Sequence, residues 1–171
     1  MIKVVSVEQM RRIEAAADAS GLSYAAMMQR AGQAVAERVL TLIENLPDAR
    51  VTLLIGSGNN GGDGLVAGRL IAEGSRALVR FYLLKPRSEA DENFAAVRAA
   101  GLFIAYAADD HDARVLRNMV ASADVLVDAL FGIGVRLPLT GDAAKVMRCL
   151  LYTSDAADDL LCVDLGGRRI I

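Results

Sequence analysis

The sequence predicts one α/β domain in which a mostly parallel sheet carries helices on both faces. Short apolar blocks such as residues 51–55 and 125–130 alternate with stretches of helical periodicity. Apolar runs without polar alternation are typical of parallel strands that are buried on both sides. A length of 171 residues with 54% hydrophobic residues suits a single domain with its own core.

Two helices are expected before the first strand. Ser6 and Gln9 have the spacing of a capping box, and an apolar periodicity follows them until Gly21. Ser23 can cap a second helix, which Pro47 ends at the latest. These helices precede the alternating part of the chain, so we expect them to be an N-terminal addition to the sheet.

From residue 51 onward, strands and helices alternate with short links. The expected strands are residues 51–55, 77–84, 102–107 and 125–130, and the expected helices are 65–73, 88–100, 110–122 and 141–151. Helices that connect parallel strands must cross over the sheet, which favours a doubly wound arrangement. No internal repeat and no linker to a second domain is visible in the sequence.

Composition excludes several classes of function. The formal net charge is −2, with 19 lysines and arginines against 21 aspartates and glutamates, whereas nucleic-acid binders are strongly basic. The apolar blocks are far shorter than the roughly 20 residues of a membrane-spanning helix, and residues 1–14 lack the apolar stretch of a secretory signal. Cys149 and Cys162 have no C-x-x-C spacing, which argues against a zinc site or a disulfide framework. We therefore expect a cytoplasmic protein without a nucleic-acid or membrane partner.

The strongest local motif is GSGNNGGDG at residues 56–64, directly after the first strand and before a helix. Its glycines let backbone N–H groups approach a ligand closely, and a helix N-terminus at this place favours an anion. Its first residues also match the G-x-G-x-x-G fingerprint of dinucleotide-binding domains, which expects an acidic residue after the second strand. Lys85 stands there instead, which argues against the alternative that the protein is an NAD(P)-dependent oxidoreductase.

A second motif, VDALFGIG at residues 127–134, opens a later strand into another glycine loop. A carboxylate such as Asp128 needs a partner at a strand end, either a bound cation or nearby backbone amides that it caps. Oxygens of Asn60 and Asp128 could form an all-oxygen site for a cation. The sequence does not distinguish an alkali from an alkaline-earth ion. Lys85 could meet a phosphate, act as an acid or simply be a surface lysine. The single histidine, His111, leaves no room for a Ser-His-Asp triad.

Together these motifs resemble the NAD(P)H-hydrate epimerase family, the YjeF N-terminal domain. The resemblance rests on GSGNNGGDGLVAGRL followed by VDALFGIGVRLP, and on SVEQMRRIE and MMQRAGQAVA near the N-terminus, and it extends from Val5 to about Leu150. It implies a Rossmann-like three-layer αβα sandwich. It also implies a repair activity, the interconversion of the R and S forms of the hydrated coenzymes NADHX and NADPHX, in support of a dehydratase that acts on the S form.

The resemblance also implies roles for particular residues. The implied substrate-binding residues are Asn59, Asn60, Gly61, Gly62, Asp63, Gly132, Ile133, Gly134, Val135, Arg136, Leu137, Pro138 and Asp164, the implied potassium ligands are Asn60 and Asp128, and the candidates for proton transfer are Asp128 and Lys85. A homodimer through the N-terminal helices is a further expectation. The second alternative, from another class, is a non-catalytic binding module of RNA metabolism.

The sequence departs from the family pattern after residue 150. Family members continue with a strand and an aspartate followed by I-P-S-G, whereas this chain has CVDLGG at residues 162–167. We therefore expect an epimerase domain at residues 1–150 and an atypical tail at 151–171, a translated sequencing artefact in place of the last part of the domain. On that interpretation Asp164 matches by coincidence, activity or stability is reduced, and the parent gene could continue into a fused dehydratase.

Overall fold

The computed structural model describes residues 5–135, 137–155 and 169–170. Its elements follow the predicted alternation, with α1 (Val7–Ala19), α2 (Tyr24–Leu42), β1 (Arg50–Ile55), α3 (Asn59–Gly74), β2 (Leu78–Leu83), α4 (Glu92–Ala99), β3 (Phe103–Tyr106), the 3-10 turn η1 (Ala107–Asp109), α5 (Arg114–Ala121), β4 (Val125–Ala129), α6 (Gly141–Asp155) and β5 (Arg169–Ile170). The sheet has the strand order β3-β2-β1-β4-β5, and all of its pairs are parallel. The predicted doubly wound α/β fold is confirmed.

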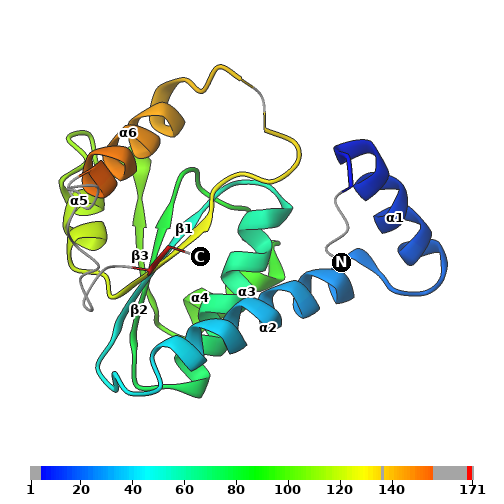
Figure 1. Ribbon diagram of the computed structural model, residues 1–171, viewed down its shortest axis with the longest axis horizontal. Coiled ribbons are helices and arrows are strands. Elements are labelled where there is room, and N and C mark those ends of the chain that lie inside the picture. The colour runs from blue at the N-terminus through cyan, green and yellow to red at the C-terminus, as the bar shows by residue number, and fades with distance from the viewer. Residues whose placement is uncertain (1–4, 136, 156–168, 171) are drawn as a thin grey trace.

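The sheet lies between two layers of helices (Figure 1). Helices α2, α3 and α4 cover one face, where Leu53 and Ile55 of β1 are fully buried against them. Helices α5 and α6 cover the other face, where Leu54 packs with Leu116 and Val146. Because successive side chains of a strand point to opposite faces, the apolar residues of β1 serve both cores. The arrangement is the three-layer sandwich that the sequence predicts.

Helix starts follow the capping signals of the sequence. The Ser6 backbone N–H donates to Gln9 Oε1 at 2.7 Å and the Gln9 N–H donates to Ser6 Oγ at 3.2 Å, which confirms the predicted capping box of α1. Ser23 Oγ accepts from the Ala26 N–H at 3.2 Å at the start of α2. Although it is well capped, α1 has no buried residue and stands apart from the body of the domain (Figure 1).

Three helix starts differ from the prediction, because α4 begins at Glu92 rather than at residue 88 and the starts of α5 and α3 also differ. Helix α5 begins at Arg114 rather than at residue 110, because the buried Asp110 lies ahead of the helix and accepts backbone N–H groups from Val115 and Leu116 at 3.1 and 2.9 Å. Those hydrogen bonds hold the pKa of Asp110 below its ordinary value, against the opposing effect of its burial. Helix α3 begins at Asn59 rather than at residue 65, inside the glycine-rich motif.

No helix within the described ranges is long and apolar enough to cross a membrane. Residues 160–163, an apolar block of the tail, lie outside the described residues, as does Asp164. Helix α6 continues to Asp155, past its expected end at residue 151.

Candidate functional site

The glycine-rich motif forms the first turns of α3 rather than a loop. Its cap, Gly58, has extended backbone with φ −92° and supplies no side chain to the free N–H groups of the first turn. Those N–H groups and the helix dipole therefore remain available to a negatively charged ligand.

Glycine is required in this motif because backbone segments touch there. A Cβ on Gly56 would lie 1.8 Å from the carbonyl oxygen of Leu130, in the loop that follows β4. A Cβ on Gly61 would lie 2.0 Å from the carbonyl oxygen of Gly56. The two glycine-rich segments can approach each other this closely only without side chains at these positions.

The two motifs meet between β1 and β4. At this point the strand order reverses, because β2 and β3 were added on one side of β1 and β4 is added on the other. Strands β1 and β4 are neighbours, with Ile55 opposite Ala129, yet α3 follows β1 on one face and α6 follows β4 on the other. The Gly56 N–H donates to the Ala129 carbonyl at 3.0 Å, and Asn60 Nδ2 donates to the Phe131 carbonyl at 3.1 Å. In open α/β sheets, ligands bind at such a switch point, beyond the carboxyl ends of the strands.

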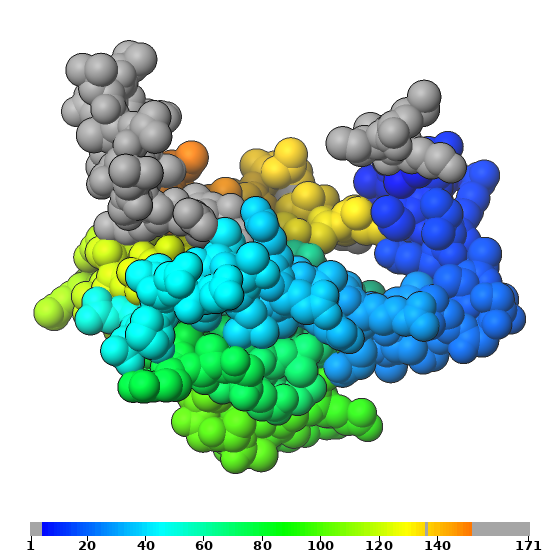
Figure 2. All heavy atoms as spheres, turned by 60° about the horizontal axis from the view of Figure 1, so that its bottom comes forward, coloured from blue at the N-terminus to red at the C-terminus, as the bar shows by residue number. Residues whose placement is uncertain are grey.

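A crevice of about 500 Å³ opens at this point between three walls. The first wall is the α3 segment with Ser57 to Asn60 and Asp63, the second is the loop 130–135, and the third is α1 with Arg11 and Glu14. In Figure 2 the blue surface of α1 and the yellow surface of the loop lie side by side, although they are far apart in the sequence. The two glycine-rich motifs therefore border one crevice.

Charge in the crevice is unevenly distributed. Burial, together with the nearby carboxylate of Glu14, raises the pKa of Asp63 from 3.8 to about 6. Among the described lining residues, Arg11 is the one cation. The crevice therefore offers a positive side chain, free helix N–H groups and a carboxyl group, that of Asp63, with a pKa of about 6.

Arg87 holds the turn before α3 in place through hydrogen bonds. Its Nη1 donates to the Gly56 carbonyl at 2.8 Å, and its Nε donates to Asp91 Oδ2 at 2.6 Å. Asp91 in turn caps α4 by accepting from the Asn93 and Phe94 N–H groups. The turn after β1 is thus tied to the start of α4 through one partly buried guanidinium group.

We expect Arg87→Ala to lower the free energy of unfolding by about 1–3 kcal/mol, because hydrogen bonds to a charged group are lost and the Gly56 carbonyl loses its donor. Urea unfolding measures this change. The matched control is Arg76→Ala, which removes an exposed ion pair with Asp48 and should cost about 0.5 kcal/mol or less. Equal losses in the two variants would contradict a fastening role for Arg87.

Several predicted site residues line the crevice directly, namely Asn59, Asn60, Asp63, Gly132, Ile133, Gly134 and Val135. Gly61 and Gly62 are buried within α3 beneath this surface, and Leu137 and Pro138 are exposed beyond the end of the lining loop. Arg136 and Asp164 lie outside the described residues.

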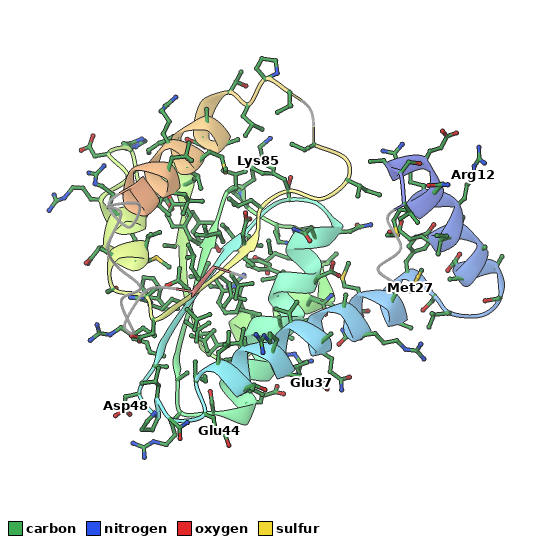
Figure 3. The ribbon with its side chains drawn as sticks, viewed as in Figure 1. Arg12, Met27, Glu37, Glu44, Asp48 and Lys85 are labelled. Atoms are coloured by element: carbon green, nitrogen blue, oxygen red, sulfur yellow. The ribbon has the colours of Figure 1, made fainter. Side chains whose placement is uncertain are left out.

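The two candidates for proton transfer are not among the lining residues of the crevice. Asp128 is exposed at the end of β4, opposite Leu54, and its Oδ1 accepts the Leu130 N–H at 2.9 Å, as the capping alternative expects. Lys85 is exposed at the carboxyl edge of the sheet, just after β2 (Figure 3). Their catalytic roles stay predictions.

Sequence reasoning missed Arg11, Glu14 and Arg87. Arg11 and Glu14 belong to the SVEQMRRIE segment that supported the resemblance, and that segment is the signal that could have pointed to them. Arg87 follows Lys85 and Pro86 at the carboxyl end of β2, where a charged side chain can reach the neighbouring β1 turn. The Asn60 and Asp128 side chains both bond to backbone of residues 130–131, Asn60 through its Nδ2 and Asp128 through its Oδ1, so the two side chains meet at one turn.

This fold and crevice define a Rossmann-like α/β domain with a ligand site at the switch point of its sheet. The chain belongs to the family described as YjeF-related protein N-terminus, which matches residues 24–165. It is 37% identical to the NAD(P)H-hydrate epimerase of Rhodobacter capsulatus, a match that covers 99% of this chain and 78% of the relative.

Other relatives are longer proteins. The chain is 34% identical to the bifunctional NAD(P)H-hydrate repair enzyme Nnr of Thermofilum pendens, and the match covers 87% of the chain but only 29% of that relative. The crystal structure of yeast ynu0, YNL200c, superimposes with a TM-score of 0.76 at 22% sequence identity, over 90% of this chain and 67% of that chain. This structural likeness shows a shared fold.

Proposed function

We propose that this chain is an NAD(P)H-hydrate epimerase, which interconverts the R and S forms of NADHX and NADPHX. The observation that carries the proposal is the crevice in which the NNGGD segment of α3 faces the glycine loop 130–135. Relatives with the printed names NAD(P)H-hydrate epimerase and NAD(P)H-hydrate repair enzyme support the same reaction.

The crevice suits one end of a dinucleotide. Its volume of about 500 Å³ falls in the roughly 300–1,000 Å³ range of small-molecule sites. The unpaired N–H groups at the start of α3 and the Arg11 guanidinium favour phosphate oxygens. Ile133 and Val135 give the opposite wall an apolar surface, against which a nicotinamide ring can pack.

The reaction proposed is an acid-assisted exchange of the hydroxyl group on carbon 6 of the hydrated ring. Loss of the hydroxyl as water leaves an iminium ion that is delocalised over the ring, and water then returns to either face. Neither step is a net oxidation or reduction, so the crevice needs a proton donor and acceptor rather than a hydride carrier. Asp128 and Lys85 are the candidates that the sequence supplies for this proton transfer.

A potassium ion is part of the proposal, with Asn60 and Asp128 as ligands. The Asp128 carboxylate and the Phe131 carbonyl lie at this turn, and such oxygens suit a hard cation, while Asn60 presents its Nδ2 to the Phe131 carbonyl. Among the described residues there is no group of three or more His, Cys, Asp or Glu side chains that could hold a metal, so backbone carbonyls would complete the shell. When bound, the ion would supply positive charge that offsets the charge of a diphosphate.

We expect Asp128→Ala to fold, to lose epimerase activity by at least about tenfold, and to lose any acceleration of the wild type by potassium. The measurement is the epimerisation rate at increasing potassium chloride, with sodium chloride keeping the ionic strength constant. A folded variant that equilibrates the epimers at the wild-type rate would show that Asp128 has neither role.

The proposed function itself is tested by incubating purified NADHX with the protein and separating the R and S epimers by chromatography. Enzymatic epimerisation should exceed the rate without protein. A parallel sample with intact NADH and a carbonyl substrate tests the oxidoreductase alternative, which requires loss of the reduced coenzyme.

The physiological setting follows from the same chemistry. A dehydratase that consumes the S epimer is the proposed functional partner, and the bifunctional repair enzymes among the relatives support a coupling of two activities. A cytoplasmic location and a homodimer are part of the proposal as well. Size-exclusion chromatography with light scattering tests the dimer.

A further inference from the structure

Two carboxylates from different helices line the same crevice. Asp63 lies on the first turns of α3 and is half-buried, and Glu14 lies on α1, with both residues lining the same cavity. The backbone of α3 is held firmly at this point, because a Cβ on Gly32 of α2 would lie 2.8 Å from the Asp63 carbonyl oxygen. The position of Asp63 is therefore set by packing between α2 and α3.

The charges around Asp63 come from few elements. Helix α1 presents Glu14 and Arg11, and the turn before α3 is fastened by Arg87. Helix α2 packs Gly32 and Met28 against this part of α3, and neither residue carries a titratable group. The loop 130–135, with sequence LFGIGV, has no titratable side chain.

We propose that Asp63 is the catalytic residue that gives the proton to the departing hydroxyl group and takes it back, and that Glu14 is a positioning residue that acts through Asp63. The proposal rests on the epimerase function proposed above and names the group within the crevice that moves the proton. It differs from the sequence-based candidates, since Asp128 and Lys85 are exposed and lie outside the lining of the crevice.

The chemistry balances with one proton. The bond between carbon 6 and its hydroxyl oxygen breaks, the electron pair stays on the oxygen, and the oxygen takes the Asp63 proton and departs as water. The ring nitrogen shares its lone pair with the cation that remains. Water then attacks either face of carbon 6 and returns a proton to the Asp63 carboxylate, so the residue is restored after each turnover.

Electrostatics support this role. The pKa of Asp63 is raised to about 6, first by burial and then by Glu14, so the side chain is protonated part of the time near neutral pH. A general acid works best when its pKa is close to the working pH. An ordinary exposed aspartate, with a pKa of about 3.9, would almost never carry the proton at pH 7.

Three variants separate the roles. Asp63→Asn should reduce kcat by about 100-fold or more, the usual contribution of a general acid, with little change in KM. Glu14→Gln should retain most of the activity at pH 5.5, but the alkaline decline of kcat should move to lower pH, because Asp63 loses the neighbouring charge. Each unit of that movement lowers kcat about tenfold at higher pH. Glu14→Asp should restore most of the wild-type profile.

The matched control on the same helix is Glu8→Gln. Glu8 pairs with Arg12 at 3.0 Å, both side chains are about three-quarters exposed or more, and Arg12 lies on the outer side of α1 (Figure 3). This variant should keep both the rate and the pH profile of the wild type.

A second readout does not depend on turnover. Carbon-13 NMR of aspartate carboxyl groups, with the Asp63 signal assigned by its loss in Asp63→Asn, should show a titration midpoint near 6 that falls in Glu14→Gln. An active wild type with an equally active Asp63→Asn variant, or an unchanged midpoint in Glu14→Gln, would overturn the inference alone. A wild-type protein that does not epimerise NADHX would overturn the proposed function, and this inference with it.

Discussion

Gly56→Ala is expected to lower the free energy of unfolding by about 3 kcal/mol and to abolish epimerase activity, since overpacking against rigid surroundings costs this much. The added Cβ would lie 1.8 Å from the Leu130 carbonyl oxygen, which is backbone and cannot rotate away. Neither segment can yield easily, because the Gly56 N–H donates to the Ala129 carbonyl and Arg87 holds the Gly56 carbonyl. Relief of the clash would therefore separate the ends of β1 and β4, after which two walls of the crevice begin.

The matched control is Gly58→Ala in the same motif. A Cβ on Gly58 would meet nothing within 4 Å, and its φ of −92° suits any residue. We expect this variant to unfold within about 1 kcal/mol of the wild type, since alanine is a poorer helix N-cap than glycine but meets no clash. Urea unfolding of both variants, with NADHX epimerisation on the same samples, makes the comparison. Similar losses at both positions would mean that close packing is not what Gly56 provides.

Asp63→Asn should have the opposite effect on stability, even though it is expected to reduce kcat by about 100-fold or more. In the folded protein the pKa of Asp63 is raised from 3.8 to about 6, so ionisation of this side chain disfavours the folded state. The cost is absent below pH 3.8, grows as the pH rises toward about 6, and is complete above that pH. Asparagine has nearly the same shape and no charge, so the variant should be more stable than the wild type by about 1–2 kcal/mol at pH 8. This figure is below the full linkage value, because solvent screens a partly exposed group.

The test is urea unfolding of Asp63→Asn and wild type at pH 4 and at pH 8. The two proteins should have similar stability at pH 4, and the variant should gain its advantage between pH 4 and pH 6. Glu14→Gln should show part of the same gain, because it removes one of the two causes of the raised pKa. A variant that is less stable than the wild type at pH 8 would contradict an unfavourable charge at Asp63.

Much of this molecule can be predicted from local sequence. The apolar run at residues 51–55 and the Ser6–Gln9 capping box each depend on near neighbours, and the structure confirms both. The meeting of the two glycine motifs follows from topology, because parallel strands end at one edge and adjacent ends share a crevice.

Other features depend on tertiary contacts that no local pattern records. The start of α3 at Asn59 could not be predicted from local sequence, because glycine lowers helix propensity. The segment is held in helical form by packing against Met28 and Ile55. Asp110 looks like a first-turn residue of α5, but its carboxylate instead caps the helix from outside while it accepts the Tyr82 hydroxyl. The effect of Glu14 on the pKa of Asp63 depends on where α1 lies. Because α1 has no buried residues, its hydrophobic pattern does not show which part of the domain it lies against.

The exposure of α1 has a consequence for how such a protein can change over time. The buried residues that stabilise the sandwich form two hydrophobic cores, whereas Arg11 and Glu14 lie on a helix that contributes no buried residue to either core. Substitutions on α1 can therefore retune the acidity or ligand preference of the crevice at little folding cost. Selection can act on the chemistry of this wall while the rest of the scaffold stays constant.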